Sequence, residues 1–234
     1  MSNKKTIIGI IIVVLLIIAL IAISYFYNDF NTKQITTLSE EANKILEVDL
    51  TQDYIDFEIK TEKNYAKVEK AVKEYTSSLK NIYVEMEEMA SGINPNVIFS
   101  AENMENKKLD AVDDILSEYK NKAQDLISEY EELVKEENII GNMSKYDITT
   151  RREYYTNLYN DIMFSEMMQK KYNKLEEEIK NQKGNLYDKL NKLQKIKEFF
   201  EKNENDWTIK DDQIQITNII KITEYYNLVN QIID

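Results

Sequence analysis

The sequence of 234 residues contains no cysteine and no histidine. Without cysteine the chain cannot form a disulfide, carry lipid on a thiol or hold an iron–sulfur cluster. Without histidine it lacks an imidazole general base, a haem ligand of that type and the usual zinc ligands. We therefore expect a protein that is not an enzyme and has no cofactor and no metal site.

Proline and glycine are also scarce, with one and four residues respectively. Tight turns depend on these residues, so their scarcity favours long helices and an all-α fold. The net charge is −12, and no basic stripe offsets it. Because a DNA or RNA backbone would repel such a chain, we expect no nucleic acid among its partners.

One long apolar run lies near the N-terminus, where residues 7–23 are Ile, Val, Leu and Ala with a single Gly. A helix rises about 1.5 Å per residue, and the hydrocarbon core of a bilayer is about 30 Å thick. Residues 6–27 therefore have the length of a transmembrane anchor. A helix buried in a protein core is a poor alternative, because so uniform an apolar surface needs cover on every side.

The flanks of this run predict how it is oriented. Lys4 and Lys5 precede it, and the positive-inside rule places such charges in the cytoplasm. We expect residues 1–5 to be a cytoplasmic stub and the bulk of the chain to be extracytoplasmic, anchored in the cell membrane by one pass. Three aromatic residues suited to a membrane interface follow the run: Tyr25, Phe26 and Tyr27.

A cleaved secretory signal is the alternative interpretation. Residues 22–24 have the small-x-small form that a signal peptidase recognises. Against cleavage, the apolar run is long for a signal, and bulky aromatic residues follow the cleavage point immediately. The sequence favours an uncleaved anchor.

Residues 28–50 are interpreted as a juxtamembrane segment, and residues 51–234 as an extracytoplasmic helical bundle. Within the bundle, residues 65–89 carry large apolar side chains at alternating three- and four-residue steps, which is typical of one helix face. Residues 109–133 repeat this pattern. Gly92 and Asn94-Pro95 predict a break between the two helices, with the asparagine as the cap of the next element.

A third long helix is predicted to begin at Thr149 or Thr150, with capping-box spacing to Glu153. It should continue through Gly184 to about residue 200, because the apolar stripe keeps its phase there. Its first part is rich in tyrosine and methionine. Ordinary core packing is the favoured interpretation, and an adaptable ligand or partner surface is the alternative. That candidate surface consists of Tyr154, Tyr155, Tyr159, Met163, Met167 and Met168.

Residues 207–216 can form a small β-hairpin around a two-residue turn at Asp211-Asp212. The turn would pair Ile209 with Ile214 and Trp207 with Ile216, and a loop leading into the last helix is an equally good interpretation. The short C-terminal helix has an apolar stripe of Ile219, Ile222, Tyr226, Val229 and Ile233.

The apolar faces of these helices are wider than the seam of a two-stranded coiled coil. Wide faces and short breaks predict an elongated antiparallel bundle of three long helices that bury one another's apolar faces. The alternative is self-association, in which another copy of the chain buries these faces. Acidic groups at Asp110, Asp113, Asp114 and Glu176 to Glu178 are interpreted as solvated helix faces.

We expect a scaffold, spacer or docking surface for another envelope protein. The alternative is a sensory or small-ligand-binding module that works with a membrane partner.

Overall fold

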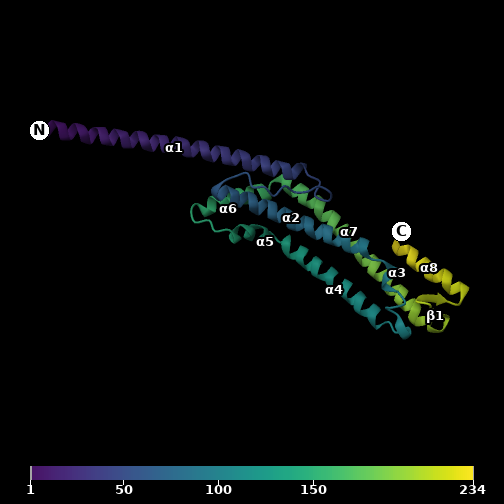
Figure 1. The fold of residues 1–234 in the computed structure, drawn as a ribbon. Helices are drawn as coiled ribbons and strands as arrows, with labels where there is room; N and C mark the ends of the chain where they lie inside the picture. Colours follow the sequence, from purple (N-terminus) through teal and green to yellow (C-terminus); the bar gives the residue numbers. More distant parts are fainter. Residues whose placement is uncertain (1, 234) are drawn as a thin grey trace.

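A computed structural model describes the backbone of residues 2–233 and the side chains of residues 24–232. The chain is mostly helical, with 77% helix and eight α-helices beside one two-stranded antiparallel sheet in the described residues. These helices form an elongated bundle, and the N-terminal half of α1 (Ser2–Glu47) projects beyond one end of it (Figure 1). The prediction of a predominantly helical bundle is confirmed.

Three helices form the centre of the bundle: α2 (Lys63–Gly92), α4 (Asp110–Leu133) and α7 (Glu166–Lys202). α4 runs in the opposite direction to α2 and α7 (Figure 1). Every large apolar residue of the predicted α2 face is buried, and the α4 face is buried or half-buried. At about 1.5 Å per residue, the 37 residues of α7 span about 55 Å. The bundle is therefore a rod.

Residues 28–47 of the predicted juxtamembrane segment belong to α1, which continues without a break to Glu47. The second half of this helix packs against α2 and α7, and Leu38 and Ile45 of this half are buried. Residues 48–62, called here the connecting segment, then return alongside α1 to the start of α2 without forming a helix (Figure 1). Leu50 and Ile55 of this segment are buried and hold it against the bundle.

The break after α2 agrees with the sequence. α2 ends at Gly92, and the side chain of Asn94 accepts a hydrogen bond from the backbone N–H of Asn96 at the start of α3 (Pro95–Ile98). A 3-10 turn, η1 (Glu105–Lys107), then leads into α4. Local capping chemistry was sufficient to predict this corner.

The predicted third helix is divided in two. After α5 (Glu136–Gly141) and the 3-10 turn η2 (Asn142–Lys145), the chain forms α6 (Arg152–Met163) and then α7. Ser165 separates α6 from α7 because its side chain accepts a hydrogen bond from the Met168 N–H and caps α7. Continuity through Gly184 is confirmed, whereas the predicted cap at Thr150 is wrong. The residue before α6 is Arg151, in a left-handed conformation with φ 54°.

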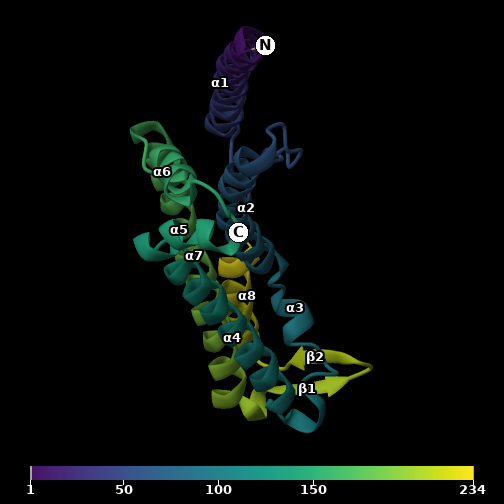
Figure 2. The same ribbon diagram turned by 90° about the vertical axis from the view of Figure 1, so that its left-hand side faces the viewer.

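The far end of the rod carries η3 (Glu204–Asp206), the hairpin of β1 (Trp207–Lys210) and β2 (Gln213–Ile216), and α8 (Ile219–Ile233). The hairpin projects from the side of the bundle near α3 (Figure 2). Its register pairs Trp207 with Ile216 and Ile209 with Ile214, as predicted. Both turn residues have positive φ, as a tight hairpin turn requires.

The predicted stripe of α8 is displaced around the helix. Ile219 and Tyr226 are exposed, whereas Val229 and Ile232 are buried and Tyr225 and Leu228 pack on the core. Both faces of this helix carry apolar residues, so the sequence pattern did not distinguish the packed face from the exposed one.

Candidate functional site at the junction of α1 and the bundle

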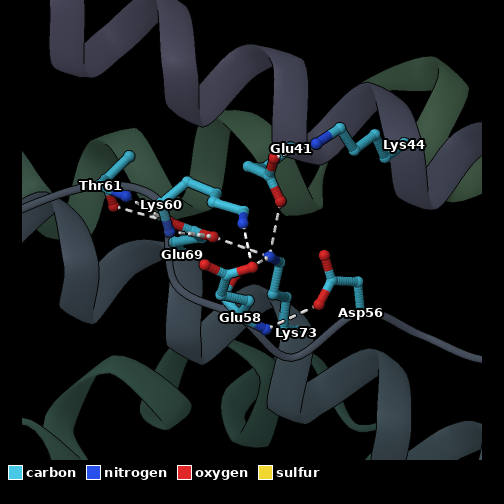
Figure 3. A network of polar contacts seen from close by, with 8 residues as sticks. All are labelled: Glu41, Lys44, Asp56, Glu58, Lys60, Thr61, Glu69 and Lys73. Atoms are coloured by element: carbon cyan, nitrogen blue, oxygen red, sulfur yellow. Dashed lines mark hydrogen bonds and ion pairs between the residues drawn. The ribbon is translucent and has the colours of Figure 1, made fainter.

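Three charged side chains are buried where α1 meets α2. They are Glu41 of α1 and Glu69 and Lys73 of α2, called here the charged cluster, with side chains only 4%, 1% and 3% exposed. The Lys73 Nζ atom lies 2.6 Å from an oxygen of Glu41 and 2.7 Å from an oxygen of Glu69 (Figure 3). One ammonium group therefore bridges two helices.

The connecting segment is bound to the same cluster. Lys73 donates its remaining hydrogen bond to the backbone carbonyl of Glu58, at 2.8 Å. The Glu69 carboxylate accepts hydrogen bonds from the backbone N–H groups of Lys60 and Thr61 and from the Thr61 hydroxyl (Figure 3). The three N–H donors of the Lys73 ammonium group are thus used by Glu41 of α1, Glu69 of α2 and the backbone of the connecting segment. The cluster therefore joins α1, the connecting segment and α2 at one point.

The electrostatics of the cluster favour its charged forms. Burial raises the pKa of Glu41, but hydrogen bonds from Lys44 and Lys73 outweigh that effect and hold the pKa below its usual value. Burial lowers the pKa of Lys73, but its bonds to Glu41 and Glu69 outweigh burial and raise the pKa above its usual value. Neither group is placed to exchange a proton near neutral pH, so the arrangement acts as a clamp.

These two shifts predict how stability depends on pH. A carboxylate with a lowered pKa stabilises the fold above its ordinary pKa of about 4.3, and that contribution is lost as pH falls through the lowered value. A lysine with a raised pKa stabilises the fold below about 10.4, and that contribution is lost as pH rises through the raised value. The free energy of unfolding should therefore be nearly constant from about pH 6 to pH 9 and fall on both sides.

Urea titrations at a series of pH values, followed by far-ultraviolet circular dichroism, measure this profile. Glu41→Gln should make the loss of stability at acid pH less steep, because one buried carboxylate no longer has to be protonated. Glu40→Gln, which removes an exposed carboxylate from the neighbouring position of α1, is the control. An identical acid slope in both variants would contradict the role assigned to Glu41.

A shallow groove lies beside the cluster, lined in part by Lys44, Ile45, Tyr54 and Ile55, with a volume of about 340 Å³. Glu41 and Lys73 form part of its wall. Their polar atoms are already bonded to one another and to Lys44, so they offer a ligand little beyond packing contacts. Among the residues with described side chains, no group of acidic side chains is placed to hold a metal ion.

A second set of contacts joins α1 to the bundle at Asn31, which lies closer to the N-terminus of α1 than Glu41 does. The Tyr65 hydroxyl donates to the Asn31 side chain at 3.1 Å and lies 3.3 Å from the Tyr154 hydroxyl. The ring of Tyr155 meets that of Tyr65 edge to face, with the ring centroids 5.1 Å apart. We call Tyr65, Tyr154 and Tyr155 the tyrosine cluster. Burial raises the pKa of Tyr65 and Tyr155, so these hydroxyls stay neutral and serve as hydrogen-bonding groups.

Most of the tyrosine and methionine residues of the candidate ligand or partner surface are core residues. Tyr155, Tyr159, Met163 and Met168 are buried, in agreement with the favoured interpretation of core packing. They do not form a surface, because the break at Ser165 folds α6 against α2 and turns these side chains inward. Tyr154 is half-buried within the tyrosine cluster.

Met167 is the exception, with 65% of its surface exposed. It lines an open groove between the end of α1 and the start of α7, together with Leu46 and Lys171. Lys171 donates hydrogen bonds to the backbone carbonyls of Leu46 and Val48. The groove therefore lies over another attachment of α1 to the bundle.

The structure describes the side chains of only some of the predicted membrane-interface residues. Tyr25, Phe26 and Tyr27 are exposed on α1. Lys4, Lys5 and the apolar run 7–23 lie outside the residues whose side chains are described. In the part of the chain that could be searched, no helix is both long enough and apolar enough to cross a membrane.

The sequence interpretation missed the charged cluster. Glu69 and Lys73 lie four residues apart, a spacing that is usual on a solvated helix surface. The sequence feature that could have indicated their burial is that each directly follows an apolar residue of the predicted α2 face, Val68 and Val72. The partner on α1 could not be recognised, because Glu41 lies 32 residues before Lys73 in the sequence.

Comparison with models of known protein families, with curated proteins and with solved structures found no match for this chain. The geometry of the junction is therefore the main basis for assigning a function.

Proposed function

We propose that this protein is a single-pass membrane protein whose helical rod lies outside the cytoplasm and acts as a non-enzymatic spacer, scaffold or docking surface for another envelope protein. Residues 6–27 of α1 would be the anchor, with Lys4 and Lys5 on the cytoplasmic side. The observation that carries the proposal is the continuity of α1. One helix leads from the apolar run into the bundle, and the charged cluster fixes it there.

The junction supports a spacer in particular. A flexible linker after the anchor would let the rod take any direction, whereas α1 is held by the charged cluster and by the tyrosine cluster. The rod extends from the junction to the hairpin and α8 at its far end (Figure 1). Ile219, Ile220 and Tyr226 are exposed there, and in this proposal they form the surface that a partner, or a second copy of the chain, would meet.

The alternative function, binding of a small ligand among the tyrosine and methionine residues of α6 and early α7, receives less support. Tyr159, Met163 and Met168 are at most 1% exposed and are packed by protein. A ligand would have to displace core side chains in order to bind among them.

Labelling of single cysteines in intact cells tests the proposed topology. The chain has no cysteine of its own, so one introduced thiol reports one position. Ser91→Cys, at an exposed position near the end of α2, should react with a membrane-impermeant maleimide in intact cells. Ser2→Cys should react only after the membrane is permeabilised.

Two other results would contradict the proposal in distinguishable ways. Reaction of Ser2→Cys but not of Ser91→Cys in intact cells would mean that the orientation is inverted. Extraction of the protein from membranes by alkaline carbonate would mean that residues 6–27 do not span the bilayer.

A further inference from the structure

The chain has only two arginines, and they are adjacent: Arg151 and Arg152, at the start of α6. Both side chains are exposed. Among the described side chains neither forms an ion pair with a carboxylate, and Arg152 donates a hydrogen bond from Nη2 to the Ser144 backbone carbonyl at 3.4 Å. Two adjacent exposed guanidinium groups, each with most of its N–H donors unused by the described residues, can bind an anionic partner outside the chain.

The position of these arginines indicates which anion they would meet. Arg151 donates a hydrogen bond from Nη1 to the Tyr27 hydroxyl at 3.0 Å, and its guanidinium group stacks over the Tyr154 ring at 4.4 Å. Tyr27 is the last of the three aromatic residues that follow the apolar run. The start of α6 is therefore level with the predicted membrane interface, at the end of the rod from which α1 projects (Figure 1).

We propose that Arg151 and Arg152 bind the phosphate groups of phospholipid headgroups and so hold the rod at a fixed angle to the membrane. The inference rests on the proposed function, because it requires α1 to enter a membrane at Tyr27. A guanidinium group offers paired N–H donors that match two phosphate oxygens, which a lysine ammonium group cannot do. Exposed Lys63, at the start of α2, adds a third positive charge at this end of the rod.

The net charge around Arg151, Arg152 and Lys63 is small. Glu62 and Glu153 lie next to Lys63 and Arg152 in the sequence, so a detached bundle would bind vesicles weakly. Tethering changes this balance, because the anchor keeps the arginines within reach of the headgroups at a high effective concentration. The contact would thus set the orientation of an anchored rod rather than recruit a free one to the membrane.

The test uses the full chain reconstituted into vesicles of phosphatidylglycerol and phosphatidylcholine. Thr150→Cys places one fluorophore beside the arginines, and a lipid with a spin label on its headgroup quenches it only when the two are close. We expect strong quenching at this position and little at Lys210→Cys in the distal hairpin. Each arginine near an anionic surface changes the ratio of docked to undocked protein roughly five-fold, so Arg151→Gln with Arg152→Gln should lower it roughly 25-fold.

Lys120→Gln with Lys122→Gln is the matched control, because it removes two exposed positive charges from α4 in the middle of the rod. Its quenching should equal that of the unmodified chain. Circular dichroism of both double variants checks that the fold is intact. Quenching at Thr150→Cys that the arginine variant does not reduce would overturn the inference.

Flotation of the vesicles separates this inference from the proposed function. If the chain does not float with the vesicles, the anchor itself is absent and both proposals fail. If it floats but the fluorophore at Thr150→Cys is not quenched, α1 is anchored and only the headgroup contact fails.

Discussion

Replacing Lys73 by methionine is expected to lower the free energy of unfolding by about 3–5 kcal/mol, because the change leaves two buried carboxylates without their shared counter-charge. Glu41 would keep only Lys44, which is largely exposed, and Glu69 would keep the hydrogen bonds from Lys60 and Thr61. Urea unfolding followed by far-ultraviolet circular dichroism measures the loss. Because the cluster joins α1 to α2, hydrogen exchange in the second half of α1 should also become faster.

Lys197→Met is the matched control for this experiment. Lys197 also bridges two carboxylates, those of Asp113 and Glu201, but these partners are 54% and 47% exposed. Water can solvate both once the lysine is removed, so the expected loss is at most about 1 kcal/mol. Equal losses in the two variants would show that burial of the charged cluster does not carry the effect.

The charged cluster also predicts a compensating change. In a background of Glu41→Gln and Glu69→Gln, the same Lys73→Met substitution should cost much less than in the unmodified chain, since no buried charge is then left unpaired. The glutamine side chains still present an oxygen to the N–H groups that Glu69 accepts from. A loss that is the same in both backgrounds would mean that packing of the lysine stem, not its charge, is responsible.

Replacing Phe200 by alanine is expected to lower the free energy of unfolding by about 3–5 kcal/mol, through the lost burial and the cavity that remains. Phe200 is fully buried at the distal end of the rod, where its ring meets those of Phe99, Trp207 and Tyr225 at centroid distances of 5.3 to 5.7 Å. The same residue accepts a hydrogen bond at its backbone carbonyl from the indole of Trp207. This one ring therefore holds α7, the hairpin and α8 together.

Trp207 is the only tryptophan of the chain, so its fluorescence reports on this end of the rod alone. In Phe200→Ala its emission should shift to longer wavelength and its urea transition should move to a lower concentration. Phe164→Ala, in the break between α6 and α7, removes a partly exposed ring and should have a small effect. A Trp207 transition that does not move in Phe200→Ala would contradict the packing described for the distal end.

Features that depend on neighbouring residues could be predicted from the sequence. The faces of α2 and α4 follow from apolar residues at three- and four-residue steps, and the start of α3 follows from Asn94 and Pro95. The hairpin register follows from the alternation of apolar residues around Asp211-Asp212. In each case the interactions that decide the structure lie within a few residues along the chain.

Features that depend on which side of a helix meets another helix could not be predicted in the same way. The C-terminal helix has apolar residues on two faces, and only its packing against Phe199 and Phe200 shows that Tyr225 faces inward while Tyr226 faces solvent. The break at Ser165 was hidden because apolar residues continue on both sides of it. For the tyrosine and methionine residues the sequence favoured core packing, but it did not show that Met167 alone among them would be exposed.

The sequence by itself determined that the chain is helical, that it has no cysteine or histidine for the chemistry that depends on them, and that it carries a run of residues suited to a membrane anchor. Only the tertiary structure placed Glu41 on Lys73 and Tyr27 on Arg151, contacts between residues 32 and 124 positions apart. The physical reason is that a charge on a helix has the same local pattern whether water or another helix covers it. Which of the two covers it depends on how distant segments pack.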